Sequence, residues 1–432
     1  MKLNKTTGEV MKVDIIIKNI GELLTLKGAA KPRSGEKEMN ELGIIRDGAI
    51  AISDNRIEAV GTSNEIMQNY FSDLIIDAEN KVVMPGFVDS HTHPVFVNTR
   101  ENEFEMRIKG KTYVEISQSG GGIRSSIESV RKASEEELFK LSKQRILRMI
   151  ANGTTTLEAK SGYGLSTESE LKMLRVIRKL DETLPIDIVP TFLGAHEFPP
   201  EYKNNREEYI RILTEEMLPK VKEENLAKYC DIFTEKHVYT IEQSRKILSH
   251  AKKLGFKIRM HADEIEPIGG AELAAEIGAI SADHLGAASD NGIKAMKNAG
   301  VIATLLPGTI FSLGMKTYAR ARDMIAAGLP VALATDYNPG SCNCDNMQMI
   351  ITLATLQMKM TVAEAIIAST INAAYALELG DKIGSLEKGK NADILIMDMP
   401  SYKYLPYHFG SNNVKIVIKN GKIIKTNRDY LS

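Results

Sequence analysis

The chain of 432 residues contains no tryptophan and only three cysteines, Cys230, Cys342 and Cys344. An odd and sparse set of cysteines argues against a disulfide scaffold and is typical of a protein from a reducing compartment. Cys342 and Cys344 are too few to form a structural zinc site on their own, and the sequence assigns them no role. We therefore expect a fold without covalent cross-links, in the cytoplasm.

The chain also lacks a charge excess and a long hydrophobic run. Its formal net charge is -1, so no overall field attracts nucleic acid or anionic lipid. The N-terminal sequence MKLNKTTGEVMKVDIIIKNIG has no basic region followed by an apolar core, and no apolar run reaches the ~18 residues that span a bilayer. We expect a soluble cytoplasmic protein whose partner is a small molecule rather than nucleic acid or membrane.

What the sequence does contain is a hydrophobic fraction of 43% over 432 residues, enough for a large domain and a modest second one. Both ends read as short strands: residues 13–20 (VDIIIKNI) and 48–60 near the N-terminus, and 392–397 (ADILIM) and 414–424 near the C-terminus. The polar stretch 27–43, with Pro and Gly, predicts an exposed loop. The economical interpretation is one small β-sandwich built from both termini.

The middle of the chain alternates short apolar strands with amphipathic helices such as residues 134–153 and 241–255, each of which ends in glycine. Eight candidate strands end in polar residues: VVMPGFVDSHTH, TTTLEAKSG, DIVPTFLGAHE, CDIFTE, KIRMHADE, SADHL, VIATLLP and PVALATD. This alternation predicts an α/β protein with a (β/α)₈ TIM-type barrel at 84–390, and a composite β-sandwich domain at 1–83 and 391–432. Chemistry in such barrels lies at the C-terminal ends of the strands.

Those strand ends carry metal-binding side chains. His91 and His93 lie two residues apart after the first barrel strand, so both imidazoles lie on one face and can reach one ion. His261 ends the fifth strand and Asp336 ends the eighth. Three imidazoles and one carboxylate suit Zn²⁺ or Fe²⁺ with a position left open for water, whose pKa the metal lowers. Taken singly each residue has an ordinary structural alternative, and only the set indicates a metal site.

Two further residues are candidates for catalysis. Glu264 follows His261 by three residues, where a carboxylate can take a proton from the attacking water and deliver it to a leaving nitrogen. Asp263 is the nearer competitor. His284 ends the sixth strand and is either a fifth metal ligand, a buried structural histidine or, as we prefer, a hydrogen-bond donor to a developing oxyanion.

These motifs resemble a known family. PGFVDSHTH, HADE and ATDYNPG follow the amidohydrolase-superfamily pattern, most like its mononuclear branch. NTRENEFEMRIKGKTYVEI, SGGGIRSS, EAKSGYGL, FLGAHEFPPEY and TDYNPGS resemble the imidazolonepropionase family in order and spacing, and the similarity extends through nearly the whole chain.

The resemblance implies a role for each matching position. It implies one metal ion, Zn or Fe, held by His91, His93, His261 and Asp336, and Glu264 acting on the nucleophile. The other implied contacts are to the substrate, with Arg100 and Tyr163 at its propionate and ring and His196 at the ring. Lining the same pocket would be Asn338, Gly340 and Ser341. Without the motif, a surface salt bridge would be the ordinary interpretation of Arg100.

Two features stay open in the sequence. The glycines 120–122 before IRSSIESVRK resemble an anion-binding helix start or a flexible loop, and the sequence does not show whether they contact the substrate. Lys160 falls on the second strand rather than the fourth, where binuclear relatives carry a bridging lysine, so we expect a single metal. Neither Glu235 nor Lys236 after the fourth strand resembles that bridge.

The resemblance implies hydrolysis of 4-imidazolone-5-propanoate to N-formimidoyl-L-glutamate in L-histidine degradation. The competing hypotheses are a related deaminase of a nucleobase, another cyclic amidase or dipeptidase, and a scaffold without catalytic activity. A deaminase has no need of a carboxylate clamp at Arg100, and a scaffold has no need of an open metal position. Barrels of this kind often pair, so a homodimer is expected.

Overall fold

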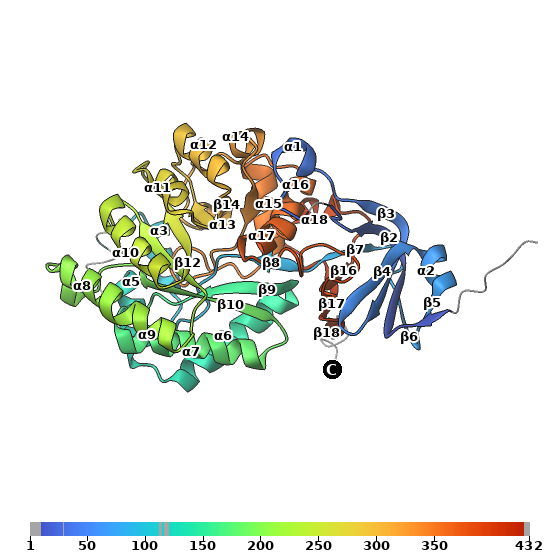
Figure 1. The fold of residues 1–432 in the computed structure, drawn as a ribbon, viewed down its shortest axis with the longest axis horizontal. Coiled ribbons are helices and arrows are strands. Elements are labelled where there is room, and N and C mark those ends of the chain that lie inside the picture. Colours follow the sequence, from blue (N-terminus) through green and yellow to red (C-terminus); the bar gives the residue numbers. More distant parts are fainter. Residues whose placement is uncertain (1–9, 29, 112–114, 116–120, 427–432) are drawn as a thin grey trace, which may run out of the picture.

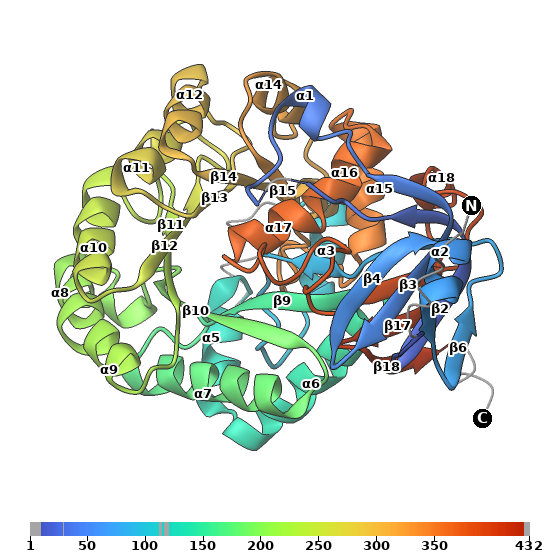
Figure 2. The same ribbon diagram turned by 45° about the vertical axis from the view of Figure 1, so that its right-hand side comes forward.

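The computed structural model describes residues 10–28, 30–111, 115 and 121–426, which form a barrel of strands and helices beside a smaller β domain (Figure 1). Helices surround the barrel strands as an outer ring, which is clearest in the turned view of Figure 2. The first and last strands of the chain lie together in the β domain, at the right of both views.

The barrel is one sheet of eight parallel strands in the order β15-β14-β13-β12-β11-β10-β9-β8. The strands are β8 (Phe87–Asp89), β9 (Thr154–Lys160), β10 (Asp187–Ala195), β11 (Tyr229–Thr234), β12 (Lys257–Ala262), β13 (Ser281–His284), β14 (Ile302–Leu305) and β15 (Val331–Leu333). Just beyond β8 and β15, a parallel bridge between Thr92 and Tyr337 joins the first strand to the last. Each of the eight predicted segments contributes a barrel strand, although the first part of VVMPGFVDSHTH forms β7 (Val82–Pro85) of the β domain instead, and the predicted (β/α)₈ barrel is confirmed.

The helices pack their apolar faces on the barrel and begin and end at recognisable signals. Ser134 caps α6 by accepting the amide of Glu137, and Thr240 forms a reciprocal cap with Gln243 at the start of α10. Gly153 and Gly255 follow these two helices with φ of 100° and 87°, a left-handed conformation that glycine adopts without strain. As far as the structure describes the chain, every helix is too short or too polar to cross a lipid bilayer.

The helices of the barrel are α3 (Glu101–Ile108), α5 (Ile123–Lys132), α6 (Glu135–Ala151), α7 (Thr167–Thr183), α8 (Arg206–Ile212), α9 (Leu218–Glu223), α10 (Ile241–Lys253), α11 (Gly270–Ile277), α12 (Asp290–Ala299), α13 (Pro307–Ser312), α14 (Ala321–Ala326), α15 (Met347–Gln357), α16 (Val362–Ala368) and α17 (Ile371–Ala376), with single turns at η1 (Pro200–Tyr202) and η2 (Leu213–Met217). The short helix α18 (Tyr404–Tyr407) belongs to the C-terminal segment of the β domain.

The β domain is a second sheet built from both ends of the chain, in the order β18-β17-β16-β7-β2-β3-β4 with β6 also on β2. Its strands are β2 (Ile15–Leu24), β3 (Ile44–Ser53), β4 (Arg56–Thr62), β6 (Leu74–Asp77), β7 (Val82–Pro85), β16 (Ile394–Met397), β17 (Val414–Lys419) and β18 (Lys422–Thr426); β1 (Met11–Lys12) pairs with β5 (Tyr70–Phe71), and α2 (Ser63–Asn69) covers one face. Ile15 and Ile17 face one apolar cluster while Ile16 faces another, as the alternation of a strand requires. The antiparallel pair of β7 with β16 joins the two ends, which confirms a composite β domain.

The predicted exposed loop at 27–43 is wrong in part. The segment contains α1 (Gly35–Glu38), and Arg33, Met39 and Leu42 are buried. Met39 and Leu42 join the main hydrophobic core, and the amide of Arg33 donates to Asn372 Oδ1 at 2.7 Å. The few apolar residues within this polar stretch hold it against the barrel, as Figure 1 shows for α1 beside α14.

Candidate metal centre and active site

The seam that closes the barrel brings three of the four predicted metal ligands together. The Asp336 amide donates to His91 O at 3.1 Å and the His93 amide to Tyr337 O at 2.8 Å. The side chains converge as well, because Asp336 Oδ1 lies 3.6 Å from His91 Nε2 and 3.4 Å from His93 Nε2. Positions far apart in sequence thus meet where the first and last strands end.

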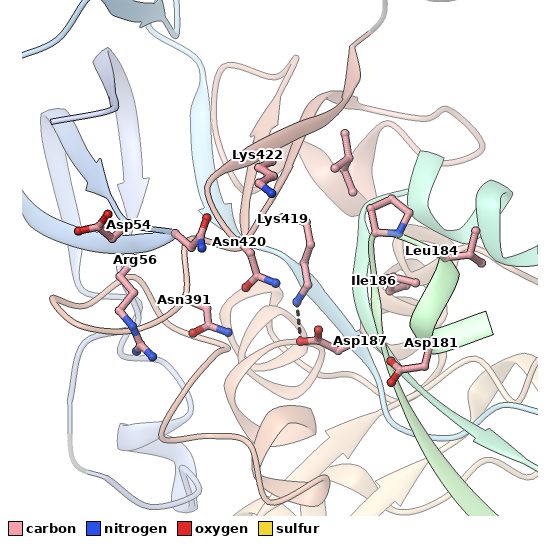
Figure 3. Close-up of a pocket in the computed structure, with 13 residues that line it drawn as sticks. Asp54, Arg56, Asp181, Leu184, Ile186, Asp187, Asn391, Lys419, Asn420 and Lys422 are labelled. Atoms are coloured by element: carbon pink, nitrogen blue, oxygen red, sulfur yellow. Dashed lines mark hydrogen bonds and ion pairs between the residues drawn. The ribbon is translucent and has the colours of Figure 1, made fainter. Parts of the chain in front are cut away.

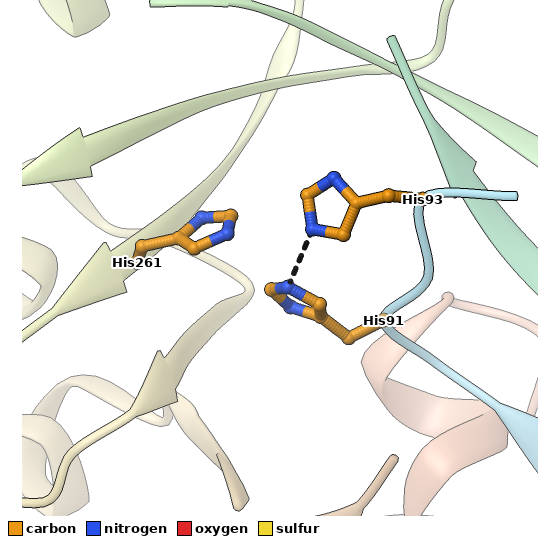
Figure 4. A group of neighbouring side chains, drawn as sticks. All are labelled: His91, His93 and His261. Atoms are coloured by element: carbon orange, nitrogen blue, oxygen red, sulfur yellow. Dashed lines mark hydrogen bonds between the residues drawn. The ribbon is translucent and has the colours of Figure 1, made fainter. Parts of the chain in front are cut away.

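His261, on the facing strand β12, completes the group. Its ring centroid lies 4.5 Å from that of His91, and nitrogens of His91, His93 and His261 all lie within 4.8 Å of one another (Figure 4). His91, His284 and Asp336 form a second, overlapping group of this kind. The structure therefore brings the four predicted ligands together and places His284 beside them.

The donor set fits a metal ion. His91 Nδ1 contacts Asp283 Oδ2 at 2.7 Å and His261 Nδ1 contacts Asp231 Oδ2 at 3.1 Å, so Nε2 is the nitrogen of each ring that is left for a metal ion. Burial lowers the pKa of His91 and His93 well below the ordinary range, so both rings are neutral, the form that binds metal. Neutral imidazoles with one carboxylate are ligands that suit zinc or iron.

A layer of buried charges supports these ligands, and the sequence did not reveal it. Lys160 Nζ lies 2.7 Å from Glu158 Oε1 and 2.8 Å from Asp231 Oδ2, and all three side chains are fully buried. Arg259 Nη2 lies 3.2 Å from Asp283 Oδ2. Burial opposes the charge of Lys160, but Asp231 and Glu158 outweigh it and raise the pKa of the ammonium group. Lys160 is therefore a charged support of the ligand shell.

A signal for this layer did exist in the sequence. Each of these charged residues lies within a short barrel strand, such as Asp283 in SADH or Arg259 in KIRMHA. A charge at such a position is buried and needs a partner. Which partners meet depends on how neighbouring strands are paired in register, and a single sequence does not show that.

The two candidates for proton transfer occupy different environments. Asp263 accepts backbone N–H groups from four successive residues, 268–271, at 2.8–3.1 Å, so its oxygens are committed to shaping the turn before α11. Glu264 lines the pocket, and burial together with the charge of Asp336 raises its pKa to about 8. His284 Nδ1 lies 3.6 Å from Glu264 Oε2. The geometry favours Glu264 over Asp263 as the group that faces a ligand.

A pocket of about 340 Å³ opens above this centre. Every predicted site residue lines it except His91, which lies buried behind its wall. The lining side chains or backbones include His93, Arg100, Tyr163, His196, His261, Glu264, His284, Asp336, Asn338, Gly340 and Ser341, joined by Glu103, Arg107, Lys111, Ile123, Glu197, Phe233, Ile265 and Leu313, which the sequence did not single out.

The residues predicted to contact the substrate differ in how many of their hydrogen-bonding groups are already engaged within the protein. His196 stacks on His93 with centroids 5.2 Å apart, and its Nδ1 contacts Gly162 O at 3.0 Å, so its other ring nitrogen is available. Asn338 is engaged in its own turn, since Oδ1 accepts the amides of Gly340 and Ser341 at 2.8 and 2.7 Å. Arg100 forms a two-pronged ion pair with Glu103, at 2.9 Å from Nε and 2.6 Å from Nη2.

The remaining sequence features lie apart from the centre. Gly122 caps α5 and its amide donates to Glu103 Oε1 at 2.9 Å, whereas Gly120 lies outside the described residues. Cys342 and Cys344 are free thiols, and burial raises the pKa of both. His237, left unassigned by the sequence, is an exposed neighbour of Glu266.

A larger pocket, about 660 Å³, lies between the β domain and the barrel (Figure 3). Two charged groups of its wall pair with each other, Lys419 Nζ with Asp187 Oδ2 at 2.6 Å. None of the metal-binding groups found among the described residues lies in its wall. The chemistry belongs to the smaller pocket at the strand ends.

Comparison with known proteins agrees with this geometry. The sequence pattern of the Amidohydrolase family matches residues 82–424. The chain is 51% identical to an imidazolonepropionase of Alkaliphilus oremlandii, over 96% of this chain and 98% of the relative. It is 48% identical to the imidazolonepropionase of Bacillus velezensis, over 96% and 97% of the two chains.

Solved structures share the fold at low sequence identity. An adenosine deaminase from Xanthomonas campestris with bound zinc superposes with a TM-score of 0.72 at 17% identity, covering 97% of this chain and 94% of that one. A 5-methylcytosine deaminase from Klebsiella pneumoniae gives 0.72 at 18% identity, over 95% and 97%. By fold, site and sequence, the chain belongs to the amidohydrolase family and, within it, to the imidazolonepropionases.

Proposed function

We propose that this enzyme hydrolyses 4-imidazolone-5-propanoate to N-formimidoyl-L-glutamate, the ring-opening reaction of L-histidine degradation. The observation that carries the proposal is that one pocket combines a metal-binding group with arginines. The metal-binding group His91, His93, His261 and Asp336 lies at its inner end, and the arginines of α3 lie in its wall. A cyclic amide that bears a carboxylate on a short chain matches both.

His91, His93, His261 and Asp336 would hold one zinc or iron ion. When bound, such an ion lowers the pKa of a coordinated water and polarises a carbonyl oxygen. His284 is the candidate to donate a hydrogen bond to the oxygen on which negative charge develops.

Glu264 is the residue we assign to proton transfer. Its carboxylate takes the proton of the attacking water and then delivers it to the ring nitrogen as the C–N bond breaks. A raised pKa suits this exchange, because a group that titrates near the working pH both accepts and releases a proton readily.

The other pocket residues position the substrate. His196 hydrogen-bonds the imidazolone ring through its free nitrogen, while Arg100 and Tyr163 hold the propionate. Gly340 and Ser341 line the wall that the Asn338 turn supports. Fixing the carbonyl in this way lowers the entropic part of the barrier, which is worth several kcal/mol in well-oriented systems.

The test is the loss of ultraviolet absorbance of freshly generated imidazolone propanoate. Purified enzyme, a metal-stripped sample and Arg100→Met are compared, and cytosine and guanine serve as alternative substrates. Fast, metal-dependent loss that Arg100→Met weakens supports the proposal. Turnover of the bases alone would replace it with a deaminase.

We also propose that the enzyme is a cytoplasmic homodimer with a small-molecule substrate and no nucleic-acid partner. The small net charge supports the absence of a nucleic-acid partner. Light scattering coupled to size exclusion measures the oligomeric state, and elemental analysis of the purified protein distinguishes zinc from iron.

A further inference from the structure

The outer wall of the active-site pocket carries three cations, Arg100, Arg107 and Lys111, all on or just after α3. They face the centre formed by His93, His261 and Asp336 across the same pocket. The three cations differ in how many hydrogen bonds and ion pairs they make, and the one with the fewest is the best placed to bind an anionic ligand.

Arg100 is already committed. Glu103 accepts from its Nε and Nη2 at 2.9 and 2.6 Å, and the two side chains are only 12% and 9% exposed. The same carboxylate accepts the Gly122 amide at 2.9 Å. Glu103 thereby neutralises Arg100, fixes its orientation and leaves Nη1 directed toward Gly340, where a Cβ would overlap it.

Arg107 lies two turns further along the same helix, on the same side as Arg100. Its guanidinium makes one long hydrogen bond, from Nη2 to Gly340 O at 3.3 Å. No carboxylate within the part of the chain that the structure describes forms an ion pair with it. Burial and the neighbouring Arg100 lower its pKa and the charge of Glu103 offsets them only in part, as expected of a partly buried cation that has no carboxylate in ion-pair contact among the described residues.

Lys111 differs from Arg107 in ion pairing and in exposure to solvent. Its ammonium lies 3.3 Å from Glu115 and its side chain is 57% exposed. A solvated lysine with a partner contributes little to binding a ligand. Against the residues that the structure describes, Arg107 is therefore the pocket cation with donors to spare, and a guanidinium fork matches a carboxylate in geometry and charge.

We infer that Arg107 is a second carboxylate-binding residue of this site, and that Arg107 supplies the uncompensated charge while Glu103 holds Arg100 in place. This inference rests on the proposed function, since it takes the carboxylate to be that of the substrate. Gly340 connects the two arginines, because its carbonyl accepts from Arg107 and its α-carbon contacts the Arg100 guanidinium.

Binding of a stable ligand pair tests the inference separately from turnover. The probes are imidazole-4-propanoate and its uncharged primary amide, measured by calorimetry with wild type, Arg107→Met and Arg107→Lys. Loss of one charge-assisted contact is expected to weaken the carboxylate about ten- to a hundredfold in Arg107→Met and less in Arg107→Lys. The amide should bind all three proteins within about twofold.

Arg178→Met is the matched control, because Arg178 is an exposed arginine on α7 outside the pocket. Imidazolone propanoate turnover is measured on the same samples. If wild type turns the substrate over but Arg107→Met binds both probes as wild type does, the inference fails and the function stands. If Arg107→Met loses the carboxylate preference and wild type shows no turnover, the anion site stands and the proposed function fails. An equal loss for acid and amide would also overturn the inference, because it would indicate a change of pocket shape.

Discussion

Replacing Lys160 with methionine is the sharpest test of how the metal ligands are supported. Methionine keeps much of the length and removes the charge. Lys160 Nζ lies 2.7 Å from Glu158 Oε1, 2.8 Å from Asp231 Oδ2 and 4.0 Å from Asp283 Oδ2, with every side chain fully buried. After the substitution, Arg259 still lies near Asp283, but Asp231 loses its closest cation and keeps the His261 ring and the amides of Ile232 and His261 as partners.

The expected loss in the free energy of unfolding can be worked out in two ways. Removing one partner of a buried ion pair costs about 3–5 kcal/mol. Alternatively, the stranded carboxylate takes up a proton, which for a group with an ordinary pKa near 4 costs about 4 kcal/mol at pH 7. With an unfolding entropy of ~2.1 cal/mol/K per residue over 432 residues, a loss of ~4 kcal/mol lowers the thermal midpoint by about 4–5 °C.

Metal affinity should fall as well, by about ten- to a hundredfold, because Asp231 orients the His261 ring. Calorimetric scans of metal-free and metal-loaded protein, with a zinc titration, measure both effects. Lys253→Met, which replaces an exposed lysine of α10, is the control and should change neither. A Lys160→Met protein with wild-type midpoint and wild-type zinc affinity would refute the reasoning.

Three further predictions concern Glu264 and the loop that carries Tyr163. Glu264→Gln should lower kcat by about 10²–10⁴ with metal content unchanged, as elemental analysis and the ultraviolet assay will show; near-normal kcat would exclude it from proton transfer. Because the metal-free fold raises the pKa of Glu264 to about 8, the folded state binds the proton more tightly than the unfolded chain does. The contribution of Glu264 to the stability of the metal-free protein should then fall as the pH rises from about 5 to 8, by up to ~1.4 kcal/mol per unit, and Glu264→Gln should reduce the pH slope by that contribution in urea titrations. Glu170 accepts the amides of Gly162, Gly164 and Leu165 at 2.8–3.2 Å, so Glu170→Ala leaves buried donors unpaired. We expect Glu170→Ala to lower the free energy of unfolding by several kcal/mol and to raise KM, and Glu170→Gln to change both quantities much less. Equal KM values for the two variants would contradict a positioning role for this carboxylate.

The sequence was sufficient for the barrel because each strand repeats a local pattern. A short apolar run ends in a polar residue, an amphipathic helix follows, and glycine marks where the longer helices end, as at Gly153 and Gly255. These signals depend only on neighbours in sequence. The pair His91 and His93 was equally readable, since the period of a strand places both on one side.

What the sequence could not supply are contacts set by strand register and by the packing of loops. The pairing of Lys160 with Asp231 requires β9 and β11 to be aligned through β10, which no local pattern specifies. The ion pair of Arg100 with Glu103 could have been predicted, because the two residues are three apart at the start of a helix. The family resemblance instead implied that Arg100 contacts the substrate.

The buried charges beneath the centre also explain why metal binding and folding belong together here. The carboxylates of the centre and its supporting layer are Asp336, a metal ligand, and Glu158, Asp231 and Asp283 beneath it, and the fixed cations are Lys160 and Arg259. Carboxylates therefore exceed cations by two, an imbalance that a low-dielectric interior tolerates poorly. The metal-free protein compensates in part at His261: burial opposes its charge, but Asp231 outweighs burial and raises the pKa of the ring. A divalent ion must displace that proton to coordinate the ring, and in doing so it restores neutrality to the whole layer. Metal binding should accordingly release protons and stabilise the barrel beyond the ligands themselves.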